Sequence, residues 1–130
     1  MKRILLIEPD WILAKTYKQA LELGGDVAVT LANTAQAAIG SADNDKPDLV
    51  ILEIQLIEHS GIEFLYEFRS YPEWQSIPVI VHTIVPFNEF QDNWHLLRDE
   101  LGVCNYLYKP HTSLRELISF TNTQKSLSRA

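Results

Sequence analysis

LVILEIQL, residues 49–56, is a continuous apolar run interrupted only by Glu53 and Gln55. Such a run is typical of a strand that helices cover on both faces of a parallel sheet, and it predicts a strand over residues 49–54. Three similar runs lie at residues 3–7, 78–83 and 105–109, and a less continuous one lies at 27–32, with stretches of helical spacing between them. This alternation predicts an α/β fold, a doubly wound five-stranded parallel sheet with helices on both faces.

Polar residues mark the expected starts of the helices. Asp10 is positioned to N-cap a first helix, which Gly24 and Gly25 would end. A second, Ala-rich helix is expected over residues 34–41, and a fourth over residues 87–101. Ser60 with Glu63, and Ser113 with Glu116, have the spacing of capping boxes that open the third and fifth helices.

Composition limits the class of protein. A chain of 130 residues with 46% hydrophobic residues is long enough for one domain, expected over residues 1–121 and followed by a frayed polar tail over 122–130. A net charge of -6 argues against direct nucleic-acid binding. A single cysteine excludes an internal disulfide, and the apolar stretch at the N-terminus is too short for a signal peptide or a membrane span. We therefore expect a soluble cytoplasmic protein that does not act at a membrane.

The carboxyl ends of the predicted strands carry the candidate functional residues. Ligand sites of open parallel sheets lie beyond these ends, near the point where the strand order reverses. The first strand is followed by Glu8 and Asp10, the third contains Glu53 near its end, the fourth ends in Thr83 and the fifth in Lys109. Carboxylates, a hydroxyl and an ammonium group are therefore expected to converge on one crevice.

Three segments resemble the receiver domains of two-component response regulators, and the resemblance covers residues 3–119. KPDLVILEIQLIEHSGIEFL (46–65) resembles the third strand and the following helix, IPVIVHT (77–83) the fourth strand, and YLYKP (106–110) the fifth. The resemblance implies a flavodoxin-like receiver fold, in which Glu53 occupies the phosphoacceptor position and Lys109 is the site lysine. It also implies Thr83 and Tyr106 as switch residues, and Pro110 as a candidate for a cis peptide bond.

Two positions depart from the family pattern. The family has a phosphorylatable aspartate where this chain has Glu53, and the extra methylene carries the carboxylate about 1.5 Å farther. Displacements of about 1 Å can slow a reaction by a factor on the order of one hundred. The family's acidic pair helps to hold magnesium, but Pro9 replaces one of its members and leaves Glu8. We therefore expect a degraded Mg²⁺ site, no cofactor and no enzyme activity, in a stand-alone pseudo-receiver that is not phosphorylated.

Output is expected through protein contacts in a fixed state. The resemblance places the partner surface on the fourth helix, the fifth strand and the fifth helix, with candidate residues Phe90, Trp94, Tyr106 and Tyr108. Phe90 and Trp94 lie four residues apart on one helix face, a spacing that equally suits packing against the core. A bulky Ile84 after Thr83 would restrict access to the site. The expected partner is a histidine kinase, another regulator, an effector or a second copy.

Other interpretations of the same residues remain open. A flavodoxin-like domain could bind a small anionic ligand near Lys109, and Glu8 with Glu53 could form an acid/base pair of a hydrolase. The Glu53 and Lys109 pair could simply stabilise the fold. His59, His82, His95 and His111 lack the spacing of metal ligands, so no zinc site is expected.

Overall fold

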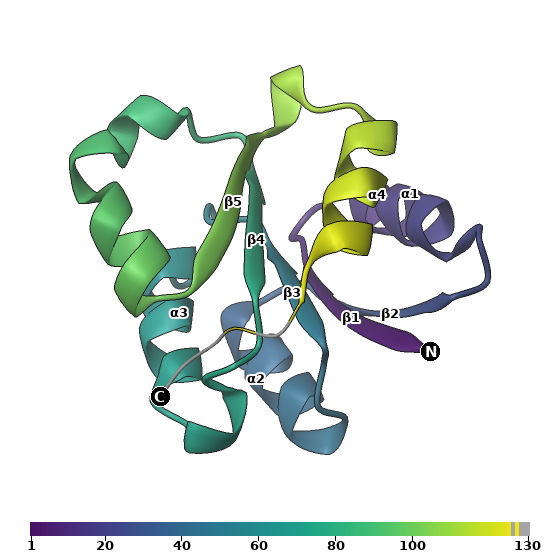
Figure 1. Ribbon diagram of the computed structural model, residues 1–130, viewed down its shortest axis with the longest axis horizontal. Helices are drawn as coiled ribbons and strands as arrows, with labels where there is room; N and C mark the ends of the chain where they lie inside the picture. The colour runs from purple at the N-terminus through teal and green to yellow at the C-terminus, as the bar shows by residue number, and fades with distance from the viewer. Residues whose placement is uncertain (126, 128–130) are drawn as a thin grey trace.

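The computed structural model describes residues 1–125 and 127 and confirms the predicted architecture (Figure 1). All strand pairs are parallel, and the spatial order is β2-β1-β3-β4-β5. The strands are β1 (Lys2–Ile7), β2 (Val27–Ala32), β3 (Leu49–Leu52), β4 (Val79–Thr83) and β5 (Val103–Tyr108). The α-helices are α1 (Trp11–Glu22), α2 (Ala35–Asn44), α3 (Gly61–Arg69) and α4 (Leu114–Thr123).

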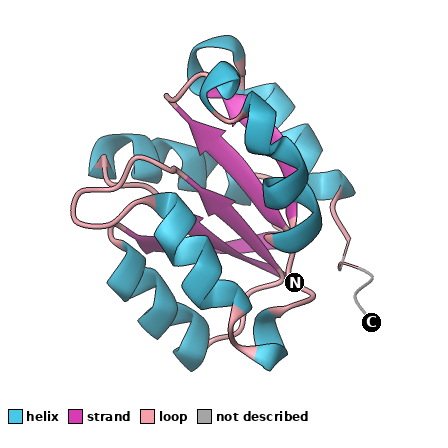
Figure 2. Ribbon diagram, turned by 90° about the vertical axis from the view of Figure 1, so that its left-hand side faces the viewer, coloured by secondary structure: helices cyan, strands magenta, loops and turns pink. Residues whose placement is uncertain are grey.

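Helices cover both faces of the sheet, as Figure 2 shows. On one face, α2, α3 and the segment 87–101 pack on alternate strand residues, with Phe64 and Phe68 fully buried in this layer. On the other face, α1 and α4 pack through Tyr17, Leu21 and Leu117. Each strand contributes side chains to both layers, which explains why the central strands consist of apolar residues without polar alternation.

Three of the helices begin at the predicted capping residues, Asp10, Ser60 and Ser113. The Asp10 carboxylate accepts hydrogen bonds from the backbone N–H groups of Ile12 and Leu13, and Ser113 with Glu116 forms a complete capping box. Ser60 accepts the N–H of Glu63 at 3.1 Å, which is one half of the expected box. The second helix is longer than predicted and ends at Asn44. No helix in the described part of the chain has the length and apolar character required to cross a bilayer.

The prediction of one helix over residues 87–101 is wrong. Short 3₁₀ helices occupy Phe87–Glu89 and Gln91–Asn93, and a π-helix occupies Leu96–Glu100. Asn88, Asp92 and Asn93 lie in or beside the broken part. Their short polar side chains compete with helical hydrogen bonding, so apolar spacing alone overestimates the regularity of this segment.

The predicted frayed tail is also corrected in part. Residues 122 and 123 belong to α4, and the Lys2 ammonium binds the backbone oxygens of Thr121 and Gln124 at its end. The N–H of Leu127 donates to the oxygen of Ser76 at 2.7 Å. The remainder of the predicted tail, residues 126 and 128–130, lies outside the described residues.

The outer edge of β2 is partly covered by side chains of α1. At Val29 the backbone N–H donates to Glu22 at 2.8 Å, and the backbone oxygen accepts from Lys18 at 2.8 Å. Lys18 and Glu22 also lie one helical turn apart and form an ion pair at 3.8 Å. Both backbone groups of Val29 are therefore satisfied within the chain.

Candidate functional site

The carboxyl ends of β1, β3, β4 and β5 bring four polar side chains together. Glu8 and Glu53 directly follow the ends of β1 and β3, and each is only 3% exposed. Thr83 is the last residue of β4 and is fully buried, and Lys109 directly follows β5. The ladder continues through both glutamates, since the Glu8 N–H binds Ala32 and the Glu53 N–H binds Ile7. Their side chains are therefore placed by the sheet itself.

The Lys109 ammonium lies between the two carboxylates. Its Nζ atom is 2.5 Å from Oε1 of Glu8 and 2.7 Å from Oε1 of Glu53. Burial by itself would lower the pKa of Lys109, but the hydrogen bonds and charges of Glu53 and Glu8 outweigh it and raise the pKa above its usual value. The lysine is thus held in its charged form, and this buried cluster carries two formal negative charges and one positive charge.

The Glu53 carboxylate accepts hydrogen bonds on both oxygens. Oε1 accepts from Lys109 and from the backbone N–H of Ile84 at 3.1 Å. Oε2 accepts from the Thr83 hydroxyl and from the backbone N–H of Gln55 at 3.0 Å. Hydrogen bonds consequently link the Glu53 side chain to the end of β4, to Lys109 after β5 and to the loop that follows β3.

Gly61 sets the tight path of the loop after β3. Its N–H donates to the oxygen of Ile54 at 2.7 Å, and a Cβ atom at this position would lie 2.6 Å from the Cα of Ile54. Only glycine permits so close an approach of two backbone segments. This contact fixes the loop that carries the Gln55 N–H against Glu53.

Asp10 and Pro9 are not part of the cluster. The Asp10 side chain is exposed and caps α1, while its backbone N–H donates to Oε2 of Glu8 at 3.1 Å. Pro9 has no side-chain oxygen. The assignment of Asp10 to the acidic pocket is therefore corrected, because capping turns its carboxylate toward the helix N-terminus and only its N–H contacts the cluster.

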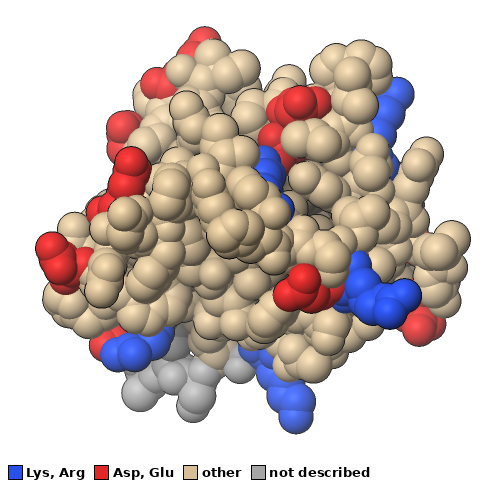
Figure 3. Space-filling view, turned by 90° about the horizontal axis from the view of Figure 1, so that it is seen from above, with Lys and Arg blue, Asp and Glu red and all other residues tan. Residues whose placement is uncertain are grey.

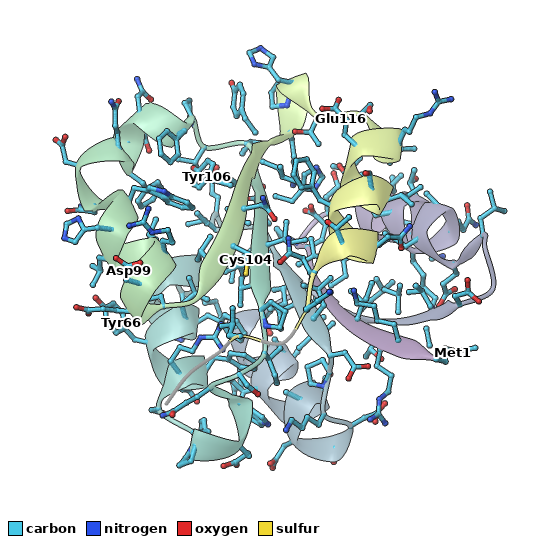
Figure 4. The ribbon with its side chains drawn as sticks, in the orientation of Figure 1. Met1, Tyr66, Asp99, Cys104, Tyr106 and Glu116 are labelled. Atoms are coloured by element: carbon cyan, nitrogen blue, oxygen red, sulfur yellow. The ribbon has the colours of Figure 1, made fainter. Side chains whose placement is uncertain are left out.

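A chain of contacts leads from Glu53 to Tyr106. Thr83 Oγ1 accepts the N–H of Val85 at 3.1 Å, and the Tyr106 hydroxyl donates to the oxygen of Val85 at 2.6 Å. Burial, followed by the charges of Glu53 and Glu89, raises the pKa of Tyr106. Figure 4 shows Tyr106 between β5 and the segment 87–101.

Phe90 and Trp94, two of the four predicted partner residues, lie around a third, Tyr106. Its ring centroid is 5.2 Å from that of Phe87, 6.0 Å from that of Phe90 and 6.5 Å from that of Trp94. Phe90, Trp94 and Tyr106 also pack against the core layer of α2 and α3 and are partly buried. Tyr108 instead contacts the ring of His111. Phe90, Trp94 and Tyr106 therefore combine core packing with a partly exposed surface.

His82 of β4 lies on the face of the sheet that α1 covers. It is buried, with its ring centroid 5.0 Å from that of Tyr17 on α1. Burial, followed by the positive charge of Lys109, lowers the pKa of His82 to about 4. The side chain is therefore neutral at pH 7 and fills the layer between β4 and α1.

The backbone donors of Gln55 and Ile84 could not be identified from the sequence, because any residue type supplies an N–H. Pro110 was a candidate for a cis bond, but no peptide bond among the described residues is cis, so this prediction is wrong. Pro110 occupies a 3₁₀ turn, Lys109–His111, instead. Within residues 1–125 and 127, no group of three or more His, Cys, Asp or Glu side chains is arranged to hold a metal ion.

Figure 3 views this end of the sheet from above, where acidic side chains lie along the rim and acidic and basic side chains also lie next to each other near the middle. Lys109 is neutralised by two carboxylates, so the crevice does not favour an anionic ligand. A doubly wound parallel sheet with a lysine, a hydroxyl and carboxylates at its strand ends defines a receiver-type signalling module. The chain belongs to the response regulator receiver domain family, whose family model matches residues 4–121.

Relatives and solved structures agree with this assignment. The chain is 34% identical over 110 residues to the KDP operon transcriptional regulatory protein KdpE of Escherichia coli, covering 85% of this chain and 45% of KdpE. The matched part spans about half or less of the length of KdpE and of two other curated regulators, and 66% of the polar-differentiation response regulator DivK of Brucella anthropi. The non-phosphorylated HemR receiver domain of Leptospira biflexa is 25% identical, with a TM-score of 0.79 and coverage of 100% of this chain and 98% of that one. A two-component response regulator of Clostridium difficile is 27% identical, with a TM-score of 0.78 and coverage of 94% and 93%.

Proposed function

We propose that this receiver domain works without phosphorylation, in a single state that Glu53 maintains. The observation that carries the proposal is the hydrogen bonding of the Glu53 carboxylate, which binds Thr83, Lys109 and the N–H groups of Ile84 and Gln55. In the receiver family, the equivalent hydroxyl and lysine surround the phosphoacceptor. Here the longer side chain itself contacts both groups.

Phosphoryl transfer to Glu53 is disfavoured by the same contacts. A carboxylate that attacks phosphorus must present a free lone pair in line with the bond that breaks. Both oxygens of Glu53 already accept two hydrogen bonds each. Attack by Oε1 would therefore require the bonds from Lys109 and Ile84 to break, and attack by Oε2 those from Thr83 and Gln55.

The residues do not fit the magnesium ion that the family uses. Magnesium requires several oxygen ligands in near-octahedral geometry. The carboxylates of Glu8 and Glu53 are both bound to Lys109, the Asp10 carboxylate caps α1, and Pro9 supplies no side-chain oxygen. We therefore propose that no magnesium ion takes part in the function of this chain.

The fixed state extends to the surface around Tyr106. The Glu53 carboxylate accepts hydrogen bonds from the Thr83 hydroxyl and the Ile84 N–H. The Thr83 oxygen accepts the Val85 N–H, and the Val85 oxygen accepts the Tyr106 hydroxyl. Tyr106 in turn packs against Phe87, Phe90 and Trp94. A protein partner that binds this aromatic surface would meet one arrangement of it, whatever the supply of phosphodonor.

The proposal is tested with a small-molecule phosphodonor and intact mass measurement. In the presence of Mg²⁺ the native chain is expected to gain no phosphoryl group. The matched variant Glu53→Asp with Pro9→Asp restores a shorter acceptor and a second carboxylate, and it is expected to gain one in a Mg²⁺-dependent manner. A phosphoryl group on Glu53 of the native chain, transient or stable, would overturn the proposal.

A further inference from the structure

A groove between α2 and α3 has no role in the site described above. It has a volume of about 600 Å³ and lies between Ala35, Gln36, Ile39 and Gly40 of α2 and Glu63, Phe64 and Glu67 of α3, with His59 at its end. Ile39 is partly exposed and supplies apolar surface above the buried Phe64, while Gln36, Glu63 and Glu67 are exposed around it.

Gly40 has no evident purpose within the fold. It lies inside α2, where glycine costs about 1 kcal/mol relative to alanine. A Cβ atom at Gly40 would meet nothing within 4 Å, and the residue does not have a positive φ. Neither packing nor backbone conformation therefore requires glycine here. The other reason for a glycine is close approach of a second backbone, and Gly40 lines the groove.

The charges around the groove favour one kind of occupant. Glu63 and Glu67 lie one helical turn apart on α3, and no lysine or arginine is among the residues that line the groove. His59 lies 3.4 Å from Glu63, at the end of this wall. Two carboxylates at this spacing match lysine or arginine residues one turn apart on a facing helix.

A second copy of this chain is a poor occupant. Symmetric pairing through the groove would place the Glu63 and Glu67 walls of two copies against each other, and the chain carries a net charge of -6. Like charges across an interface weaken association. The geometry instead favours a different protein with a basic helix.

We propose that the α2/α3 groove binds an amphipathic helix of a partner protein. Small or short apolar side chains of that helix lie over Ile39, its backbone approaches Gly40, and its basic residues face Glu63 and Glu67. This interface is separate from the Glu53 cluster and from the aromatic surface around Tyr106, so it adds a second binding surface to the proposed signalling function.

The test is selection from a displayed library of 16-residue helical peptides, followed by amide-shift mapping of a selected peptide on the isotope-labelled chain. Selected peptides are expected to carry lysine or arginine one turn apart beside small apolar residues. They should perturb residues 35–40 and 59–67. Gly40→Leu fills the groove and should weaken binding at least tenfold while its thermal midpoint is unchanged or raised.

Two further variants complete the test. Glu63→Gln and Glu67→Gln should each weaken binding by up to about fivefold, with the loss diminishing at high salt. Ala37→Leu, at an exposed position of α2 outside the groove, is the matched control and should bind as the native chain does. The proposal is overturned if no peptide is enriched, if enriched peptides bind Gly40→Leu equally well, or if Gly40→Leu lowers the thermal midpoint.

Discussion

The ammonium of Lys109 is 2.7 Å from the carboxylate of Glu53, across the ends of two strands that are not adjacent in the sheet. β4 lies between β3 and β5, and its last residue, Thr83, donates to the same carboxylate. The lysine therefore spans the central crevice of the sheet and also binds Glu8 at the end of β1. One cation joins the ends of three strands.

Lys109→Met is expected to destabilise the fold by about 3 kcal/mol, because it leaves two buried carboxylates without their counter-ion. The measurement is the free energy of unfolding in urea at pH 7. Lys46→Met, at an exposed position, is the matched control and should change this free energy by less than about 0.5 kcal/mol. A loss below about 1 kcal/mol for Lys109→Met would mean that the cluster is well solvated.

The same lysine predicts a loss of stability in alkali. The pKa of Lys109 is raised in the folded chain above its ordinary value of 10.5. The cluster's contribution is therefore complete below pH 10.5 and disappears as the pH rises through the folded value. The free energy of unfolding of the native chain should converge toward that of Lys109→Met as the pH rises beyond this point. If the free energies of unfolding of the two proteins change in parallel with pH, the charge of Lys109 does not supply this stability.

His82 predicts a loss of stability in mild acid. Its pKa falls from 6.5 to about 4 on folding because the ring is buried and Lys109 is nearby. The unfolded chain therefore binds the proton first, and stability should fall by roughly 3 kcal/mol as the pH is lowered from 6.5 to 4. His82→Gln should show a shallower fall over this range, whereas His95→Gln, at an exposed position, should follow the native chain. Equal slopes for His82→Gln and the native chain would argue that the ring is protonated in the fold.

Tyr106→Phe is expected to remove a tyrosine hydroxyl that ionises at a higher pH than an ordinary tyrosine. In the folded chain burial and the charges of Glu53 and Glu89 raise its pKa above the ordinary value of 10.0. The group stays protonated while the unfolded chain ionises, so its contribution to stability is lost as the pH rises above 10.0. Burial also raises the pKa of Tyr17, so an ultraviolet titration of the tyrosines should lose part of its late component in Tyr106→Phe and retain all of it in the control Tyr66→Phe. If both variants titrate like the native chain, Tyr106 does not hold its proton as described.

Gly61→Ala should destabilise the fold by about 2 kcal/mol, because the added Cβ would meet the backbone of Ile54 at 2.6 Å. Gly24→Ala is the control, since its Cβ would meet nothing within 4 Å and its φ is not positive. Thermal or urea unfolding measures both variants. A native-like midpoint for Gly61→Ala would show that the loop after β3 can shift without cost.

Sequence reasoning was strongest where residue type determines position. Continuous or nearly continuous apolar runs identified four of the five strands, and a less continuous run identified β2 at the edge of the sheet. The rule that parallel strands share a functional end then predicted the convergence of Glu8, Glu53, Thr83 and Lys109, which the structure brings together.

The details that escaped prediction depend on the backbone. The N–H groups of Gln55 and Ile84 bind Glu53 through loop conformations that no side chain specifies. The segment 87–101 has helical apolar spacing but divides into 3₁₀ and π turns, since its aromatic residues can reach Tyr106 without a regular helix. Pro110 has a trans peptide bond and lies in a 3₁₀ turn, which the resemblance to the family did not reveal.

The hydrogen bonds that α1 makes to Val29 also affect how one molecule of this chain can pair with another. An exposed sheet edge is a template on which a strand of another molecule can add. At Val29 the outward N–H and oxygen are already bound by Glu22 and Lys18, so an incoming strand would have to displace both side chains before it could pair there. The Lys18 and Glu22 side chains thus oppose the addition of a further strand to the β2 edge at Val29.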